Sequence, residues 1–220
     1  SGPALAQNAD PVKLLRVIQD TSTQDTTRIL AMTELGYNYW TTKTDSSLLL
    51  ANQSMQKARS INFAKGIGRA YFVMGVYYGN LGYSSKGLVY YDSALVYASK
   101  ASDQQGIGRV YNSLGQLYAN FGDYQKALQF HFQSLKIKEQ QSDFPGLGNS
   151  YNNIGNIYYR LGSNDKALEY CFKSLSLRKS IQDRQGIAAS QNNIALIYDK
   201  LGETTKALDY FSEALGYFKE

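Results

Sequence analysis

The feature that most constrains this chain is an internal repeat with a period of 40 residues. Four stretches align without a gap, and they begin at Gly66, Gly106, Gly146 and Gly186. A weaker copy that starts at Thr26 precedes them. Self-similarity at a period of about 20–50 residues is typical of arrays in which each unit buries its apolar side against its neighbours. We therefore expect a stack of similar units rather than one closed core.

Each copy contains two helical patterns. In the first, apolar or small residues recur at i, i+3, i+4 and i+7, as in Tyr111, Leu114, Gly115 and Tyr118. This pattern ends at a glycine, which suits the left-handed position after a helix. These glycines are Gly82, Gly122, Gly162 and Gly202. The second pattern follows a short polar turn, and no strand-like alternation occurs, so the sequence predicts an all-α protein built of helix hairpins.

Aspartates mark the expected starts of helices. Asp103, Asp143 and Asp183 precede first helices, where a carboxylate can accept hydrogen bonds from free N–H groups. Asp10 and Pro11 predict the cap and the first residue of a short entry helix. We expect a flexible leader or cloning remnant at 1–9, an entry helix and linker at 10–23, and the array at 24–220. The expected repeats are approximately 26–64, 65–104, 105–144, 145–184 and 185–220.

The copies resemble the tetratricopeptide repeat (TPR) signature, W-x2-L-G-x2-Y followed by A-x3-F. The third full copy supplies this pattern with Tyr151, Ile154, Gly155, Tyr158, Ala167 and Cys171. The resemblance implies a right-handed superhelical solenoid of about five helix-turn-helix repeats. Small residues at 75, 115, 155 and 195 would let the two helices of each hairpin approach closely.

The repeat departs from the family pattern in its length, 40 rather than 34 residues, and in lacking the terminal proline. Long repeats without this proline resemble the TPR arrays of bacterial signalling proteins. In many of those proteins an exported array precedes a membrane helix and a histidine kinase, a DNA-binding regulator or a cyclase domain. Ala4-Leu5-Ala6 has the form seen before a signal-peptidase cut. We therefore expect a periplasmic or otherwise exported sensory region of a two-component system, with a cytoplasmic location as the alternative.

The types of residue present argue against a catalytic, metal or cofactor site in this region. His131 is the only histidine and Cys171 the only cysteine, which disfavours a Cys/His zinc site and excludes an internal disulfide. Both share a repeat column with Tyr91 and Phe211, so we expect them to be buried packing residues. The glycines at 66–69 and 106–109 lack the strand and the Lys-Ser/Thr of a phosphate loop. We predict no catalytic residues, metal or cofactor, although an attached kinase or other output domain is compatible with this.

The charge balance is mild, at +5 over 220 residues, and does not indicate nucleic acid. No stretch approaches the ~20 apolar residues of a membrane span, so we expect no membrane contact. Cations recur late in the second helices, where they complement the helix dipole. We expect them to form a solvated surface rather than a nucleic-acid track; they are Lys100, Lys136, Lys138, Arg178 and Lys179.

Carboxamides recur on the side of the first helices opposite the apolar stripe, although asparagine is a poor helix former. An Asn side chain offers an acceptor and two donors, so a row of them could pair with the backbone of an extended peptide. In the TPR family the first helices line the concave surface, and similar Asn rows contact peptides in some long-repeat members. The predicted clamp is Asn112, Asn152, Asn153, Asn156, Asn192 and Asn193, flanked by Gln116, Asn120 and Asn149. Arg109 and Arg160 would supply charge for an acidic residue or terminal carboxylate.

Other interpretations stay open beside this peptide-binding groove. The asparagines could bond to one another or to loops and hold the repeats in register. In the earlier copies Phe72, Val73 and Val76 make the same side apolar, suited to a side-chain pocket or to packing by the entry helix. A structural module would assemble through its convex or C-terminal face, giving a homodimer through the uncapped last repeat. A nucleic-acid binder would show affinity that falls steeply with salt.

Overall fold

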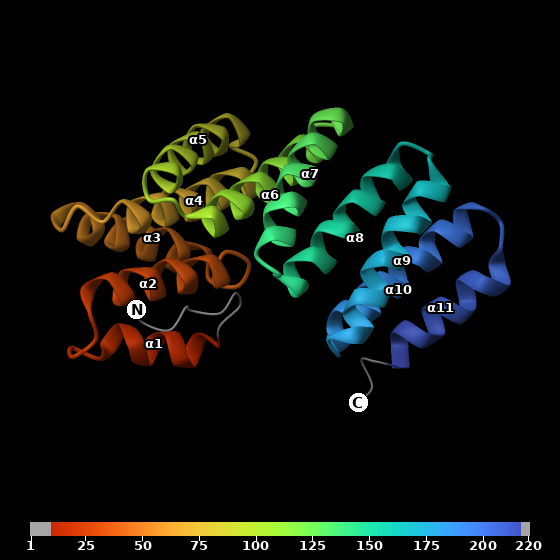
Figure 1. Ribbon diagram of the computed structural model, residues 1–220, viewed down its shortest axis with the longest axis horizontal. Coiled ribbons are helices and arrows are strands. Elements are labelled where there is room, and N and C mark those ends of the chain that lie inside the picture. Colours follow the sequence, from red (N-terminus) through yellow and green to blue (C-terminus); the bar gives the residue numbers. More distant parts are fainter. Residues whose placement is uncertain (1–9, 217–220) are drawn as a thin grey trace. The chain divides into compact units, whose positions relative to one another are not determined.

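The structure, a computed structural model, describes residues 10–216 as eleven α-helices and no strand (Figure 1). The expected leader and Ala4-Leu5-Ala6 lie outside these residues. The helices are α1 (Pro11–Gln19), α2 (Asp25–Asn38), α3 (Thr44–Ser60), α4 (Ala64–Asn80), α5 (Ser84–Lys100), α6 (Gln104–Asn120), α7 (Tyr124–Gln140), α8 (Phe144–Arg160), α9 (Asn164–Ser180), α10 (Arg184–Lys200) and α11 (Thr204–Gly216). The all-α fold of helix hairpins is confirmed.

Helix ends follow the sequence signals closely. Gly162 and Gly202 adopt φ values of +76° and +78°, the left-handed conformation predicted for a residue that ends a helix. The side chains of Asp143 and Asp183 accept hydrogen bonds from the backbone N–H groups of Gly146 and Gly186 at 3.0 and 2.9 Å. Asp10 caps α1 in the same way. The same glycine turn and the same aspartate cap therefore recur in the backbone every 40 residues.

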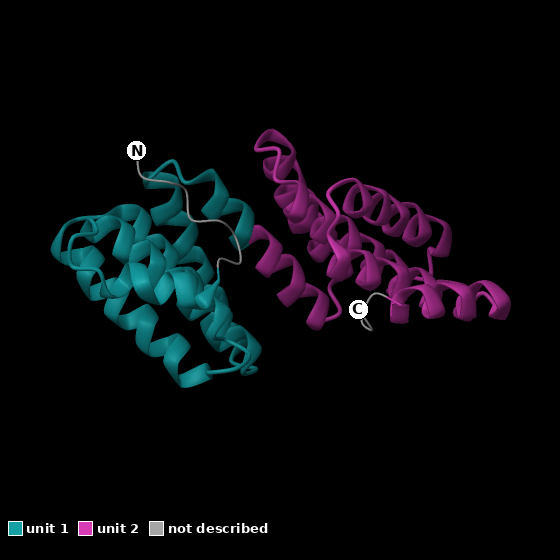
Figure 2. Cartoon of the chain, turned by 90° about the horizontal axis from the view of Figure 1, so that it is seen from below, with its two compact units in different colours: residues 1–110 teal, residues 111–220 magenta. Residues whose placement is uncertain are grey.

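The chain divides into two compact units, residues 1–110 and 111–220, and the boundary falls inside α6 (Figure 2). In unit 1 the entry helix α1 packs on α2, where Leu14 clusters with Ala31 and Leu35. Phe72 was expected to line an apolar pocket or to pack against the entry helix. Instead, the Phe72 ring stacks on the Tyr37 ring of α2, with centroids 5.5 Å apart, because α2 and α4 are neighbouring first helices.

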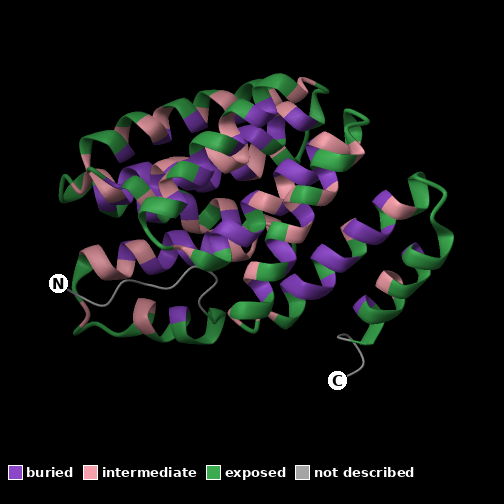
Figure 3. Cartoon of the chain, turned by 45° about the vertical axis from the view of Figure 1, so that its right-hand side comes forward, coloured by how far each residue is buried: buried purple, intermediate pink, exposed green. Residues whose placement is uncertain are grey.

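In unit 2 the core forms where a second helix meets the first helix that follows it. One cluster joins Leu128 and Leu135 of α7 to Leu147 and Ile154 of α8, and a second joins α9 to α10. The buried residues accordingly lie on the helix sides that meet neighbouring helices, whereas the turns are exposed (Figure 3). Each repeat thus completes the core of the one before it.

The small-residue column has the predicted role inside each hairpin. A Cβ added at Gly115 would lie 2.7 Å from Cε1 of His131, and one at Gly155 would lie 2.7 Å from Sγ of Cys171. Such distances are closer than packed atoms tolerate, so only glycine fits while the facing side chain keeps its place. The size of the side chain at 131 or 171 therefore determines which residue fits at 115 or 155.

Candidate binding surface on the first helices

The candidate surface lies on α6, α8 and α10, the first helices of consecutive repeats in unit 2. Asn153 Nδ2 of α8 donates a hydrogen bond to Asn112 Oδ1 of α6 at 3.1 Å. Lys200 Nζ of α10 donates to the backbone oxygen of Tyr159 in α8 at 3.0 Å and lies over its ring. The polar sides of the three helices are therefore joined to one another. We call the ten predicted site residues of unit 2 the carboxamide surface; they are Asn112, Gln116, Asn120, Asn149, Asn152, Asn153, Asn156, Arg160, Asn192 and Asn193.

Most of the carboxamide surface is open to solvent. The exposed members are Gln116, Asn120, Asn149, Asn156, Arg160 and Asn192, and the half-buried ones are Asn112, Asn153 and Asn193. Within residues 10–216, the side chains of Asn156, Asn192 and Arg160 make no hydrogen bond or ion pair. These three side chains therefore keep their full bonding capacity for a ligand.

Other members are engaged within the protein. Besides the Asn153–Asn112 pair, Gln116 Nε2 donates to Asn120 Oδ1 at 3.1 Å. Asn149 Oδ1 accepts a hydrogen bond from Arg178 Nη2 at 2.6 Å. Of these bonds, only the Asn153–Asn112 bond joins two repeats, so the interpretation that carboxamides hold the repeats in register applies to that pair. Sequence alone gave no way to separate the engaged members from the unengaged ones.

Asn152 corrects the sequence-based placement. It was predicted on the open side, but it is only 7% exposed, because α8 lies beside α10 as well as α6. Its Oδ1 has no hydrogen-bond partner among the described residues. The pair equivalent to Asn112–Asn153 one repeat later would be Asn152–Asn193, and that hydrogen bond is not formed. A buried, unpaired amide oxygen costs roughly 1–3 kcal/mol, so Asn152 is an acceptor in need of a donor.

Arg109 also differs from its predicted role. It belongs to unit 1, is 7% exposed, and its Nη1 donates to Glu34 Oε2 at 2.6 Å. The guanidinium carbon lies 5.7 Å from the centroid of the Tyr37 ring. The expectation that Arg109 offers its charge to a ligand is therefore wrong, because Glu34 already neutralises it. Burial, the largest cause, raises the pKa of Tyr37 in the same cluster.

Two cations expected on a solvated surface are buried instead. Lys138 Nζ donates to the backbone oxygen of Gly146 at 3.1 Å and to Ser150 Oγ at 2.8 Å. Arg178 Nη1 donates to Asp183 Oδ2 at 2.9 Å. Each joins a second helix to the start of the next first helix. The sequence period places them there, but the stacking of repeats, which a single helix does not reveal, buries them.

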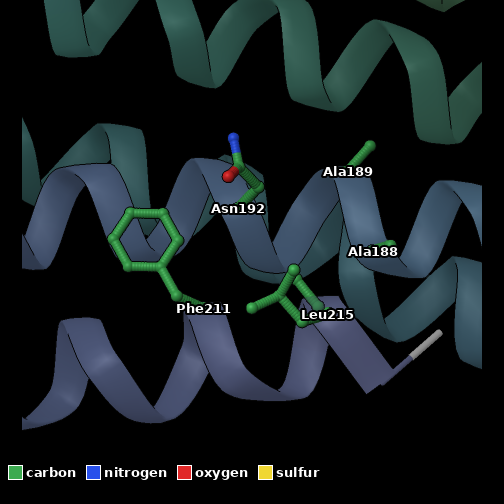
Figure 4. A pocket seen from close by; sticks show the side chains of 6 residues that line it. Ala188, Ala189, Asn192, Phe211 and Leu215 are labelled. Carbon is green, nitrogen blue, oxygen red and sulfur yellow. The ribbon is translucent and has the colours of Figure 1, made fainter. Parts of the chain in front are cut away.

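An apolar pocket lies between α10 and α11 in unit 2 (Figure 4). Its volume is about 440 Å³. We call it the α10–α11 pocket; its lining is Ala188, Ala189, Asn192, Phe211, Ala214 and Leu215. Only Asn192 belongs also to the carboxamide surface. The sequence pattern placed Phe211 in the repeat column of His131 and Cys171 but did not predict a pocket.

Two family models described as Tetratricopeptide repeat match residues 110–143 and 146–220. The hairpin geometry above agrees with that family. This chain is a tetratricopeptide repeat protein. No curated protein matches the TPR chain as a relative.

Several solved structures have a similar fold. BtubC (BKLC) from P. vanneervenii has a TM-score of 0.75 at 14% identity, over 95% of this TPR chain and 87% of that one. A Rap protein complexed with Competence and Sporulation Factor has a TM-score of 0.70 at 14% identity, over 89% of this chain and 65% of that one. NprR in complex with its cognate peptide NprX has a TM-score of 0.67 at 20% identity, over 94% of this chain and 59% of that one. At these identities the likeness shows the fold alone.

The TPR hairpins also explain the single histidine and cysteine. His131 and Cys171 are buried, as predicted, each facing the glycine of its own hairpin. Burial is the largest cause that lowers the pKa of His131, to about 4, with the charge of Lys138 second, and burial raises the pKa of Cys171 to about 12. Both are therefore neutral near pH 7. Across residues 10–216, no group of three His, Cys, Asp or Glu side chains is placed to hold a metal, and no helix is long and apolar enough to cross a membrane.

Proposed function

We propose that unit 2 is a non-enzymatic binding module that holds an extended peptide along its carboxamide surface. The observation that carries this proposal is the set of unengaged amides on adjacent first helices. Asn156 of α8 and Asn192 of α10 are exposed and have no hydrogen-bond partner within residues 10–216. An extended peptide backbone supplies N–H donors and C=O acceptors at each residue, which is the complement that such amides need.

In this proposal, the amides that bond within the protein position the helices and do not contact the ligand. The Asn153–Asn112 bond and the Asn149–Arg178 bond fix the spacing of the helices, so that the unengaged amides stay in place when the ligand is absent. A surface positioned in advance loses less entropy on binding. Arg160, exposed at the end of α8, would take an acidic side chain or the terminal carboxylate of the peptide.

Two structural neighbours support the ligand class. The Rap protein is in a complex with Competence and Sporulation Factor, and NprR is in a complex with its cognate peptide NprX. We infer by analogy of fold that this TPR chain binds a peptide or protein segment, and that it serves as the sensory or scaffolding region of a bacterial signal-transduction protein, with an exported location. A structural or assembly role is the second candidate, because exposed apolar residues on α11 favour contact with another protein surface.

The test is a screen of random extended peptides for binding, followed by substitution of the unengaged amides. Asn156→Ala with Asn192→Ala should weaken capture of the selected peptides at least about tenfold, while the helical circular dichroism stays unchanged. Gln133→Ala, an exposed carboxamide on the second helix α7, is the matched control and should bind as the unmodified protein does. Equal capture by the double variant, or no captured peptide at all, would rule the proposal out.

A further inference from the structure

The side of α6, α8 and α10 that bears the carboxamide surface carries three rows of residues, each with a spacing of four. Residues four apart on a helix lie on the same side of it, so each row is a strip along its helix. The rows are Asn112, Gln116 and Asn120 on α6, Asn152, Asn156 and Arg160 on α8, and Asn192, Leu196 and Lys200 on α10. Eight of these nine residues are carboxamides or cations, and Leu196 is the apolar exception.

The exposure of Leu196 follows from its position in the repeat. Its side chain is 41% exposed. Gln116 and Asn156 occupy the same position 80 and 40 residues earlier, and both are exposed although a further first helix follows each of them. The stacking of repeats in unit 2 therefore leaves this position uncovered. A leucine placed there meets solvent or a ligand rather than another repeat.

Leu196 lies between two polar residues of its own row. Asn192, one turn before it, is exposed and makes no hydrogen bond within residues 10–216. Lys200, one turn after it, donates a hydrogen bond to the backbone oxygen of Tyr159 on α8 at 3.0 Å, and its Nζ lies 4.5 Å from the centroid of the Tyr159 ring. This contact joins the ends of α8 and α10. Leu196 is therefore held at a fixed place beside the amides of both helices.

A leucine in this place recognises a different part of a peptide from the part that amides recognise. Carboxamides pair with backbone N–H and C=O groups, which every residue of an extended peptide has. The exposed surface of Leu196 gains free energy only when apolar atoms cover it. An apolar side chain of the peptide would do so, whereas a charged one would lose its water without finding a partner. Leu196 thus introduces a sequence preference that the amides lack.

We propose that Leu196 is a specificity-determining residue of the carboxamide surface, and that the ligand is a peptide with an apolar side chain at the place where it crosses α10. This inference rests on the proposed function and adds a sequence requirement to it. Asn156 and Asn192 hold the backbone of the peptide, and Leu196 selects which peptides bind. The strip on α8, with Asn156 at the equivalent position, sets no such requirement.

The test uses the peptides captured by the 220-residue protein in the screen described above. Leu196→Gln, which places on α10 the residue that α6 has at this position, should weaken their binding at least about fivefold, because the apolar contact is lost. Leu49→Gln on α3 is the matched control, since Leu49 is also an exposed leucine within a helix, and it should leave binding unchanged. Circular dichroism checks that both variants keep the helical content of the unmodified protein.

Substitutions in the peptide identify the side chain that Leu196 contacts. One apolar residue of each captured peptide, replaced by Ser, should weaken binding to the unmodified protein but not to the Leu196→Gln protein. A second screen, with the Leu196→Gln protein, should yield peptides that lack the enrichment of apolar residues at that position. The same enrichment in both screens would overturn the inference.

The outcomes also separate this inference from the proposed function. If Asn156→Ala with Asn192→Ala abolishes capture while the Leu196→Gln protein binds every peptide at full strength, the proposed function stands and the role of Leu196 is refuted. If no peptide is captured, or if the amide variant captures peptides normally, both fail together. Loss of capture by the amide variant for all peptides, together with weakening by Leu196→Gln that the Ser-substituted peptides escape, supports both.

Discussion

Asn153 of α8 donates a hydrogen bond to Asn112 of α6 across two consecutive repeats, at 3.1 Å. The equivalent pair one repeat later, Asn152 with Asn193, is not bonded, and Oδ1 of Asn152 is buried without a partner. The same residue type at the same repeat spacing therefore has two fates. The Asn153–Asn112 bond joins two repeats, whereas the next pair leaves a buried acceptor without a donor.

The first prediction compares a bonded and an unbonded asparagine by what each contributes to the free energy of unfolding. Asn153→Ala should lower the free energy of unfolding by about 1 kcal/mol, because a hydrogen bond between neighbouring helices is lost. Asn156→Ala should change it by less than about 0.5 kcal/mol, since that exposed side chain has no bonding partner among the described residues. Urea denaturation followed by circular dichroism measures both. Equal losses would show that the row acts as one structural network.

The second prediction concerns the buried ion pair of unit 1. Glu34→Ala should destabilise the protein by about 3–5 kcal/mol, because the guanidinium of Arg109 would stay buried without its carboxylate. The double change Glu34→Leu with Arg109→Met should recover most of that loss, since two apolar side chains need no partner. Chemical denaturation of the single and double variants is the measurement. A double variant as unstable as the single one would mean that packing, not charge, dominates there.

The fold follows from the sequence because its signals are local. A glycine at a helix end or an aspartate at a helix start acts within a few residues, and the 40-residue period repeats that information along the chain. Arg109 and Glu34 lie 75 positions apart, so no local pattern joins them. A helical projection likewise assigned Asn152 to the open side, because it describes one helix and not the neighbours that cover it. The stacking of repeats decides which polar residues remain accessible.

The third prediction is a pH dependence that originates at His131. Its folded pKa of about 4 lies below the ordinary value of 6.5, so the folded state favours the neutral ring. This stability is present above pH 6.5 and is lost as the pH falls toward 4, by about 3 kcal/mol in total. His131→Phe, the residue type that α11 has in this column, should remove that part of the pH dependence. Urea unfolding between pH 4 and 7 compares the two proteins, and parallel curves would contradict the assignment.

The fourth prediction uses a strained turn between α9 and α10. Gln182 adopts φ of +56°, a left-handed conformation that is unfavourable for a residue with a Cβ. Gln182→Gly should raise the free energy of unfolding by about 0.5–1 kcal/mol, because the relief of strain exceeds the added entropy of the unfolded chain. Gly202→Ala, at φ +78°, is the reciprocal control and should lower stability by a similar amount. Thermal and urea unfolding of the two variants measure the effects. Stabilisation by Gly202→Ala would show that chain entropy, not backbone strain, governs these turns.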